Sequence, residues 1–299
     1  MARIIFLSIM LSYCLINRPA DASAQQILVV RNQRFRPYSE ALSGFRHVLD
    51  ERFKGLDYIV REGKDAASTI RRKKPELVLA IGMDALYAVK NTEIPVVCLM
   101  VILPSAGSLE EKNITGVSMT ISPERQLSSL RRMIPGARRV GLLYDPKKSG
   151  AFVRKAQRVA RGLRMDLLAK EVSHAKDVSR ALGSLKGSID AIWMIPDTTV
   201  VTPETAELIM LFSLENRLPV CAFSAKYLEL GAFMSLDVSA FDMGKQAGEL
   251  AVRILSGANV RDIQPVEADN PTLIVNESVA RKLRIPLGDE LRSKVRIFK

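Results

Sequence analysis

The sequence predicts an α/β protein built from two similar lobes, each a doubly wound parallel sheet, joined by a hinge. Its 299 residues suit two domains of about 100 to 150 residues each. Short apolar runs alternate with stretches of helical periodicity along most of the chain. This alternation favours parallel strands, because each right-handed crossover between them needs a covering helix.

The first half is predicted to contain strands at residues 27–30, 57–60, 77–81 and 95–101, separated by helices at 38–53, 66–73 and 84–90. Each predicted strand is a short apolar run of the length that a buried strand requires. In the first helix, apolar residues recur at spacings of three and four and therefore share one face; they are Ala41, Leu42, Phe45, Val48, Leu49 and Phe53.

The second half repeats this pattern. Its first helix begins at Pro123, with Ser122 as the N-cap, and ends at Gly136. Predicted strands follow at 139–144, 165–172, 191–195 and 219–223, and predicted helices at 151–163, 175–185, 203–216 and 241–255. The tail offers two strand-like segments, 263–266 and 272–275, and a short helix opened by Asn276.

The first 24 residues are predicted to be a secretory signal peptide. Arg3 supplies a positive start, residues 4–16 form a short apolar stretch, and Ala22-Ser23-Ala24 gives an A-x-A cleavage site. The mature chain would begin at Gln25 and be exported. A lipid anchor at Cys14 is the alternative, although the preceding residue, Tyr13, is not small.

The chain is basic, with 44 Lys and Arg residues against 32 Asp and Glu and a formal charge of +12. These cations are scattered, apart from the quartet Arg71 to Lys74, and acidic residues lie between them. No zinc-finger spacing, helix-turn-helix pattern or RNA-binding motif accompanies them. We therefore expect a solvated basic surface and no nucleic-acid partner.

The two cysteines of the mature chain, Cys98 and Cys221, each lie in an apolar predicted strand. In an oxidising compartment they could form a disulfide. A buried thiol is also a common core residue, and we favour two free buried thiols.

The sequence gives no reason to expect an enzyme. The glycine-rich nucleotide motifs, G-x-S-x-G and H-E-x-x-H are absent. The only histidines, His47 and His174, fall among charged residues in helical patterns and are expected at the surface. We predict no catalytic residue, no metal site and no cofactor.

The loops that follow the predicted strands are the candidate binding site, since open α/β sheets bind ligands beyond the carboxyl ends of their strands. Asp84 and Asp197 could instead only cap helices, and Trp193 is expected in the core rather than as a stacking platform. The ligand-contact candidates at strand ends and turns are Tyr38, Met83, Asp84, Tyr144, Asp197, Thr198, Ser224 and Asp237.

An ordered set of motifs resembles the ABC transporter substrate-binding protein family that includes aromatic amino-acid-binding members. The resemblance covers nearly all of the mature chain and implies a type I periplasmic-binding-protein fold, with three hinge crossovers and a ligand between two lobes. It rests on Ile114-Thr-Gly-Val-Ser118, Gln126-Leu, Ile134-Pro-Gly-Ala-Arg-Arg-Val-Gly-Leu-Leu-Tyr144, Asp190-Ala-Ile-Trp-Met-Ile-Pro-Asp-Thr-Thr-Val200, Leu218-Pro-Val-Cys-Ala222, Gly244-Lys-Gln-Ala-Gly-Glu-Leu-Ala251, Asn276 and Leu283.

The chain departs from the family pattern where ligand chemistry is expected. A Thr-Asp-Asn turn of amino-acid-binding members becomes Pro196-Asp197-Thr198. Family aspartates align with Leu103, with Met119 and with the Phe223-Ser224 pair, which makes Met119 a further candidate site residue. The loss of three carboxylates weakens the inference of an amino-acid ligand, whose ammonium needs an acceptor. We expect a more apolar or more cationic cleft.

The resemblance implies a periplasmic binding protein that captures a small molecule and delivers it to an inner-membrane ABC permease with its ATPase. Nothing in the sequence demands more than a monomer. The alternative is a receptor subunit that signals to a membrane sensor protein without transport. An enzyme is the weakest alternative. The expected N-terminal lobe comprises residues 25–120 and 265–299, and the expected C-terminal lobe comprises 121–264.

Overall fold

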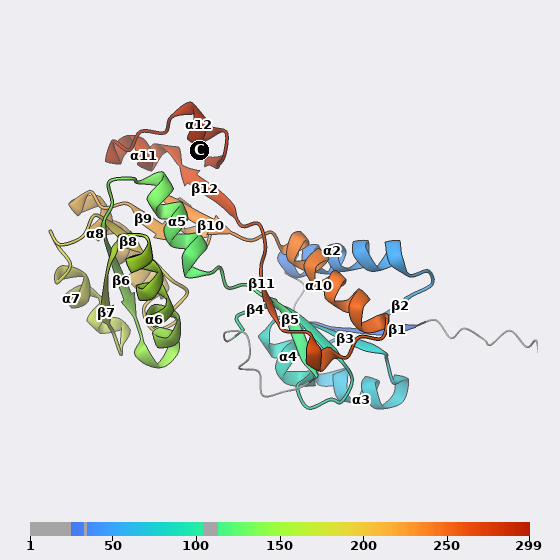
Figure 1. Cartoon of the computed structure of the whole chain (residues 1–299). Coiled ribbons are helices and arrows are strands. Elements are labelled where there is room, and N and C mark those ends of the chain that lie inside the picture. The colour runs from blue at the N-terminus through green and yellow to red at the C-terminus, as the bar shows by residue number, and fades with distance from the viewer. Residues whose placement is uncertain (1–24, 33–34, 104–112) are drawn as a thin grey trace, which may run out of the picture.

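The computed structural model describes residues 25–32, 35–103 and 113–299. The predicted signal peptide and Cys14 lie outside the described residues. Two sheets with their covering helices form two lobes that lie side by side (Figure 1). None of the described helices is both long and apolar enough to span a membrane.

The first sheet has six strands, in the order β2-β1-β3-β4-β5-β11. Every neighbouring pair is parallel. The central strands β1, β3 and β4 are almost entirely apolar, as strands covered on both faces must be. The strand bounds are Gln26–Val30 (β1), Asp57–Arg61 (β2), Leu77–Ile81 (β3), Val96–Val101 (β4), Ile114–Ser118 (β5) and Val266–Glu267 (β11).

The second sheet has seven strands, in the order β7-β6-β8-β9-β10-β12-β13. All pairs are parallel except β10 with β12, which is antiparallel. The bounds are Arg139–Tyr144 (β6), Asp166–Glu171 (β7), Ala191–Trp193 (β8), Val220–Ala222 (β9), Met234–Asp237 (β10), Thr272–Asn276 (β12) and Arg296–Phe298 (β13).

Helices cover both faces of each sheet, so each lobe has two apolar cores. In the six-stranded lobe the helices are α2 (Arg36–Arg52) and α10 (Ala240–Leu255) on one face, and α3 (Gly63–Lys73) and α4 (Met83–Val89) on the other. In the seven-stranded lobe they are α5 (Pro123–Met133), α6 (Pro146–Gly162) and α11 (Glu277–Leu283) on one face, and α7 (Val178–Gly183), α8 (Pro203–Asn216) and α9 (Lys226–Glu229) on the other.

The first five strands of each lobe share one order. In sequence order within each lobe, both read 2-1-3-4-5, which is a doubly wound arrangement. This confirms the predicted fold class of two similar parallel-sheet lobes. Within the described residues, the chain crosses between the sheets three times, at residues 119–122, 238–239 and 268–271.

The allocation of segments to lobes differs from the expected one in two places. The long helix α10, expected in the C-terminal lobe, packs on α2 of the six-stranded lobe. Strands β12 and β13, expected in the N-terminal lobe, belong to the seven-stranded sheet. The chain therefore returns to its first lobe for residues 240–267 and then goes back to the second.

Contact between α2 and α10 depends on glycine. A β-carbon added to Gly44 would lie 1.9 Å from the Phe241 carbonyl oxygen, and one added to Gly244 would lie 2.0 Å from that of Ala41. Only a residue without a side chain lets the two backbones approach this closely. This packing holds α10 in the first lobe.

Most expected elements are confirmed to within a few residues, and the differences have local causes. Strands β5 and β10 were not predicted as elements. Residues 263–265 are not a strand, because a 3₁₀ turn (η2, Val260–Asp262) precedes the two-residue β11. Helix α6 begins five residues earlier than expected, because Asp145 caps it and Pro146 occupies its first position.

The two cysteines and the tryptophan are buried, as predicted. Cys98 lies in β4 and Cys221 in β9, so they belong to different sheets, and both thiols are free. Trp193 packs beside Phe152, and its indole N–H donates a 2.8 Å hydrogen bond to Gln126 Oε1. The expectation that Trp193 is a core residue is confirmed.

Candidate functional site

The carboxyl ends of both sheets border the crossings between the lobes. Strands β5 and β10 end directly before the first and second crossings, and β11 ends before the third. Since the strands of each sheet run parallel, apart from β12 and β13, the other parallel strands end at the same edge. Each predicted site residue is the last residue of a strand at this edge, follows such a strand, or lies in the first turn of the next helix.

The four candidates of the six-stranded lobe are Tyr38, Met83, Asp84 and Met119. Tyr38 lies over Gly82, the residue between β3 and α4: a β-carbon added to Gly82 would come within 2.4 Å of the tyrosine hydroxyl. Gly82 also has φ +91°, a conformation that favours glycine. Burial, together with the nearby carboxylate of Asp84, raises the pKa of Tyr38. The structure therefore brings Tyr38, Gly82 and Asp84 together.

This edge of the six-stranded lobe exposes large apolar side chains. Phe35 is 55% exposed, Ile102 55% and Met119 38%. The Phe35 ring meets the Tyr38 ring edge-on, with centroids 5.7 Å apart. Apolar groups left uncovered at a strand edge suit an apolar partner surface.

A bulge in β4 directs Ile102 outward. The pairing of β4 with β5 shifts register between Cys98 and Val101, and Met100 between them has φ +57°. Ser118 then fixes the loop, because its hydroxyl accepts a 3.1 Å hydrogen bond from the Leu103 N–H. Bulges commonly redirect side chains beside functional sites.

The candidates of the seven-stranded lobe are Tyr144, Asp197, Thr198, Ser224 and Asp237. Asp197, only 1% exposed, organises the loop after β8. One carboxylate oxygen accepts from the Asp145 N–H at 2.8 Å and the Ser149 hydroxyl at 2.6 Å. The other accepts from the N–H groups of Thr199 and Val200 at 2.9 and 3.2 Å. The following helix α8 is capped by Thr202 and not by Asp197, so the capping alternative for Asp197 is wrong; its carboxylate holds the loop, and its direct contact with a ligand stays a prediction.

Asp145 completes this loop network. Its carboxylate accepts from the Lys147 N–H at 2.9 Å, which caps α6, and from the Thr199 hydroxyl at 2.7 Å. The Thr199 hydrogen bond and that capping bond hold the Asp145 pKa below its usual value. With its neighbours fixed in this way, exposed Thr198 accepts a 2.7 Å hydrogen bond from Lys148 Nζ.

Polar side chains also lie at the carboxyl ends of β6, β9 and β10. The Tyr144 hydroxyl donates to Glu171 Oε1 at 3.1 Å, and burial with this bond raises the pKa of Tyr144. Ser224 is partly buried at the end of β9. Burial also raises the pKa of Asp237 at the end of β10, against the opposing effects of the Val238 N–H and Arg296.

The two edges therefore differ in chemistry: the six-stranded edge is largely apolar and aromatic, and the seven-stranded edge is polar. Among the described residues, no group of three or more His, Cys, Asp or Glu side chains could hold a metal. The sequence did not single out Phe35, Ile102, Lys148 and Glu171. Of these four, Lys148 could have been identified from the sequence, because it lies in the first turn of the helix that follows the Asp145-Pro146 cap.

The chain matches the family described as "ABC transporter substrate binding protein" over residues 61–296. It is 25% identical over 289 residues to a tyrosine-binding protein of Clostridioides difficile (strain R20291), covering 89% of this chain and 83% of that protein.

Solved structures show the same fold. A ligand-free, open substrate-binding protein with adhesive properties from Clostridium difficile matches with a TM-score of 0.77 at 23% identity, covering 92% of this chain and 99% of that one. A domain in complex with L-Trp from Streptococcus pneumonia matches with a TM-score of 0.64 at 17% identity, covering 92% of this chain and 100% of that one.

Proposed function

The chain belongs to the ABC transporter substrate binding protein family, and we propose that it captures a small solute between its two strand edges and delivers it to an ABC transporter. The family is one of solute-binding proteins rather than enzymes. The capture step is supported by the position of all nine predicted site residues at the two edges that border the crossings.

We propose a solute with a flat apolar or aromatic part. The observation that carries this proposal is the exposure of Phe35, Ile102 and Met119 beside Tyr38 on the six-stranded edge. Burying such side chains against a solute contributes about 25 cal/mol per Å² of apolar area. The relatives named as tyrosine-binding and as bound to L-Trp support an aromatic solute.

The polar part of the solute would contact the seven-stranded edge. Thr198, Lys148 and Ser224 supply donors and acceptors there, and Tyr144 with Glu171 supplies a second polar pair. Asp84 and Asp237 provide a carboxylate on each edge that can accept from a cationic or amide group. Asp197 acts through the loop that it holds in place, because its carboxylate already accepts four hydrogen bonds.

Capture would proceed by closure of the two lobes about the crossings at 119–122, 238–239 and 268–271. We propose that residues 25–118 with 240–267 move as one unit and residues 123–237 with 272–299 as the other. A few residues at the ends of elements can absorb such a rotation. Closure on a bound solute would bury the apolar edge against that solute. Without a solute this burial is absent, so only the solute-loaded protein would be stable in the closed form.

Delivery would require a membrane permease with its ATPase and a location outside the cytoplasm. Residues 1–24, with their positive start and A-x-A site, support export by a cleaved signal peptide. A monomer suffices for this function, because both strand edges come from one chain.

A thermal-shift screen of the purified protein tests this proposal. The panel comprises amino acids, nucleosides, organic acids, vitamins and thiamine-like heterocycles. A solute held at 100 times its dissociation constant stabilises the native state by about 2.7 kcal/mol, and the hits should be enriched in aromatic compounds. If a folded, ligand-free sample responds to none of them, solute capture is contradicted.

A further inference from the structure

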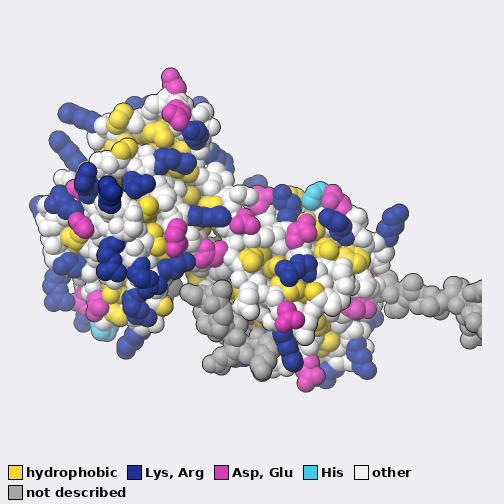
Figure 2. Space-filling view, in the orientation of Figure 1, with side chains coloured by type: hydrophobic (Ala, Val, Ile, Leu, Met, Phe, Trp, Pro, Cys, Tyr) yellow, Lys and Arg dark blue, Asp and Glu magenta, His cyan; other side chains and the backbone are white. Residues whose placement is uncertain are grey.

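The positive charge of this protein is concentrated in one lobe. Residues 121–238 and 272–299, which build the seven-stranded lobe, contain 25 Lys and Arg against 15 Asp and Glu, a formal charge of +10. Residues 25–120 and 239–271 contain 17 against 16. Figure 2 shows Lys and Arg side chains gathered over the lobe that carries α5 and α6.

A groove of about 670 Å³ lies in this lobe beside the third crossing, next to the end of β10. Helix α5 forms one wall, and the segment 293–296 before and within β13 forms the other. The third crossing contributes Asn270 and Pro271, and Leu236 and Leu273 supply apolar lining. The groove is thus open to solvent, with a partly apolar surface.

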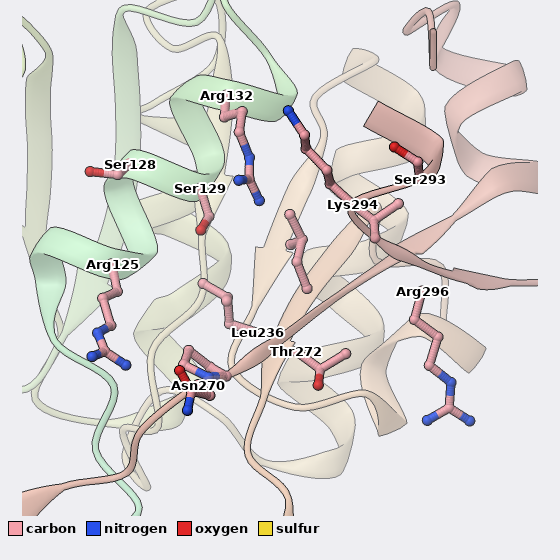
Figure 3. Close-up of a pocket in the computed structure, with 13 residues that line it drawn as sticks. Arg125, Ser128, Ser129, Arg132, Leu236, Asn270, Thr272, Ser293, Lys294 and Arg296 are labelled. Atoms are coloured by element: carbon pink, nitrogen blue, oxygen red, sulfur yellow. The ribbon is translucent and has the colours of Figure 1, made fainter. Parts of the chain in front are cut away.

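Four cations from two separate segments line the groove: Arg125 and Arg132 on α5, and Lys294 and Arg296 near the C-terminus. Arg132 and Lys294 reach over it from opposite walls (Figure 3). Ser129 points into the space beside Arg132, and Arg125 lies at the end near Asn270. Arg296 turns away from the other three in this view.

The carboxylates around the groove do not balance these cations. Arg125 is 3.4 Å from Asp269, and Lys294 is 2.6 Å from Glu290. Within the described part of the chain, Arg132 has no carboxylate oxygen within 4.0 Å. The side chains of both pairs are 46% exposed or more, so an incoming anion can compete with them at little cost.

We propose that this groove binds a small organic molecule that carries a phosphoryl group with two negative charges. Guanidinium groups match phosphate oxygens in a bidentate fork, and an ammonium adds a point charge. Arg132, Lys294 and the Ser129 hydroxyl supply this combination. The groove is larger than a free phosphate needs, and its apolar lining leaves space for the organic part.

The surrounding charge favours the same class of ligand. A lobe of charge +10 attracts anions and raises their local concentration at its surface. An anion in the groove would be close to two or more cations from its two walls. An anion on the open surface of α6 would have cations on one side only. Specific binding should therefore saturate at one site and should depend on the groove residues.

Isothermal titration of the purified protein with pyrophosphate, at low and at physiological ionic strength, tests the proposal. We expect one saturable site that weakens with salt. The double variant R132Q/K294Q should bind at least 10-fold more weakly. The control R158Q/R161Q removes the same charge from exposed positions of α6 and should change binding less than 3-fold, with circular dichroism confirming that both variants fold.

Equal weakening in the two double variants, or the absence of a saturable site, would overturn the proposal. Two sources can supply the phosphoryl group, namely a free phosphorylated compound or a lipid headgroup. Vesicles of phosphatidic acid, whose phosphomonoester headgroup can carry two negative charges, with phosphatidylcholine as the reference, separate them. Binding that pyrophosphate displaces and R132Q/K294Q abolishes identifies the headgroup, and saturable pyrophosphate binding without vesicle binding identifies a free compound.

Discussion

The hydroxyl of Tyr38 lies against the backbone of Gly82, so close that a β-carbon on the glycine would come within 2.4 Å of it. This pair joins the start of α2 to the end of β3 and sets the aromatic part of the six-stranded edge. In our proposal, the pair forms part of the surface on which the solute lies.

Gly82→Ala should therefore impair both stability and solute binding. An L-residue at φ +91° costs about 1 to 2 kcal/mol, and the added methyl displaces the Tyr38 ring. We expect solutes found by the screen to bind at least 10-fold more weakly, as measured by titration calorimetry. Gly136→Ala is the control, because nothing lies within 4 Å of its added β-carbon. Equal affinities in the two variants would show that Tyr38 plays no part in the site.

Gly244→Ala should destabilise the six-stranded lobe. The atom that the new methyl meets at 2.0 Å is the Ala41 carbonyl oxygen, and backbone cannot move aside as a side chain can. We expect a loss of about 3 kcal/mol or more in urea denaturation, at the upper end of overpacking effects. Gly162→Ala, at the end of α6 with open space around it, should instead be neutral or stabilising. A small effect of Gly244→Ala would contradict the described packing of α10 on α2.

Asp197→Ala should cost stability in the seven-stranded lobe. The substitution leaves four donors without their acceptor, three of them backbone N–H groups. Hydrogen bonds to a charged group contribute about 1.5 to 3 kcal/mol each, and we expect a total loss of about 3 kcal/mol after water replaces some of them. Asp166→Ala, at an exposed position at the start of β7, should stay within about 0.5 kcal/mol. A similar result for the two would mean that the Asp197 network contributes little.

Cys98 and Cys221 should be unreactive until the protein unfolds. Burial raises the pKa of each thiol to about 12, so almost no thiolate is present at neutral pH. Because the two lie in different sheets, Cys98→Ala and Cys221→Ala leave one reporter for each lobe. Their labelling by a disulfide reagent should be slow in the native state and fast in denaturant. Rapid native labelling of either would show that its lobe opens readily.

Asp237→Asn should raise the free energy of unfolding at neutral pH. Burial raises the pKa of Asp237 in the folded state, so the folded protein binds this proton more tightly than the unfolded chain. Its contribution to stability is therefore most favourable below the ordinary carboxyl pKa and falls as pH rises through the raised value. The variant should remove this part of the pH dependence in urea titrations.

Asp190 is the matched comparison for Asp237, because its pKa is shifted in the opposite direction. Burial acts to raise its pKa, but hydrogen bonds from Arg139 and from backbone N–H groups outweigh it and lower the pKa. Its stabilising effect is present above the ordinary carboxyl pKa and is lost as pH falls through the lowered value. Asp190→Asn should therefore destabilise at neutral pH. The same sign for both variants would contradict the difference in their environments.

The sequence was sufficient for the fold class because strand and helix periodicity, together with caps such as Ser122-Pro123, is local. It could not assign α10 to a lobe, since the chain order of residues 238–272 is compatible with either sheet. The close approach of α2 and α10 at Gly44 and Gly244 places α10 in the six-stranded lobe, but this contact is visible only in the three-dimensional structure.

The strand-end positions of the candidate site residues were predictable to the same degree, whereas their contact with a ligand stays a prediction. Positions at strand ends follow from the alternation of strands and helices, and the structure places Tyr38 in the first turn of α2, after β1, and Thr198 in the loop after β8. The exposure of Ile102 depends on the bulge at Met100, which no local signal marked. The full engagement of Asp197 depends on Ser149 and Asp145, which approach it only through the packing of β6 beside β8.

Fluorescence energy transfer between the lobes tests solute capture most directly. In a chain that begins at Gln25, dyes on Ala67→Cys in α3 and Ser179→Cys in α7 can be attached selectively, because Cys98 and Cys221 are buried. Titration with L-tyrosine, L-tryptophan and each compound from the thermal-shift screen should give a saturable change in transfer efficiency for at least one solute, and Gly82→Ala should shift that titration to higher concentration. A solute that binds and saturates without any change in transfer efficiency would contradict capture between the lobes.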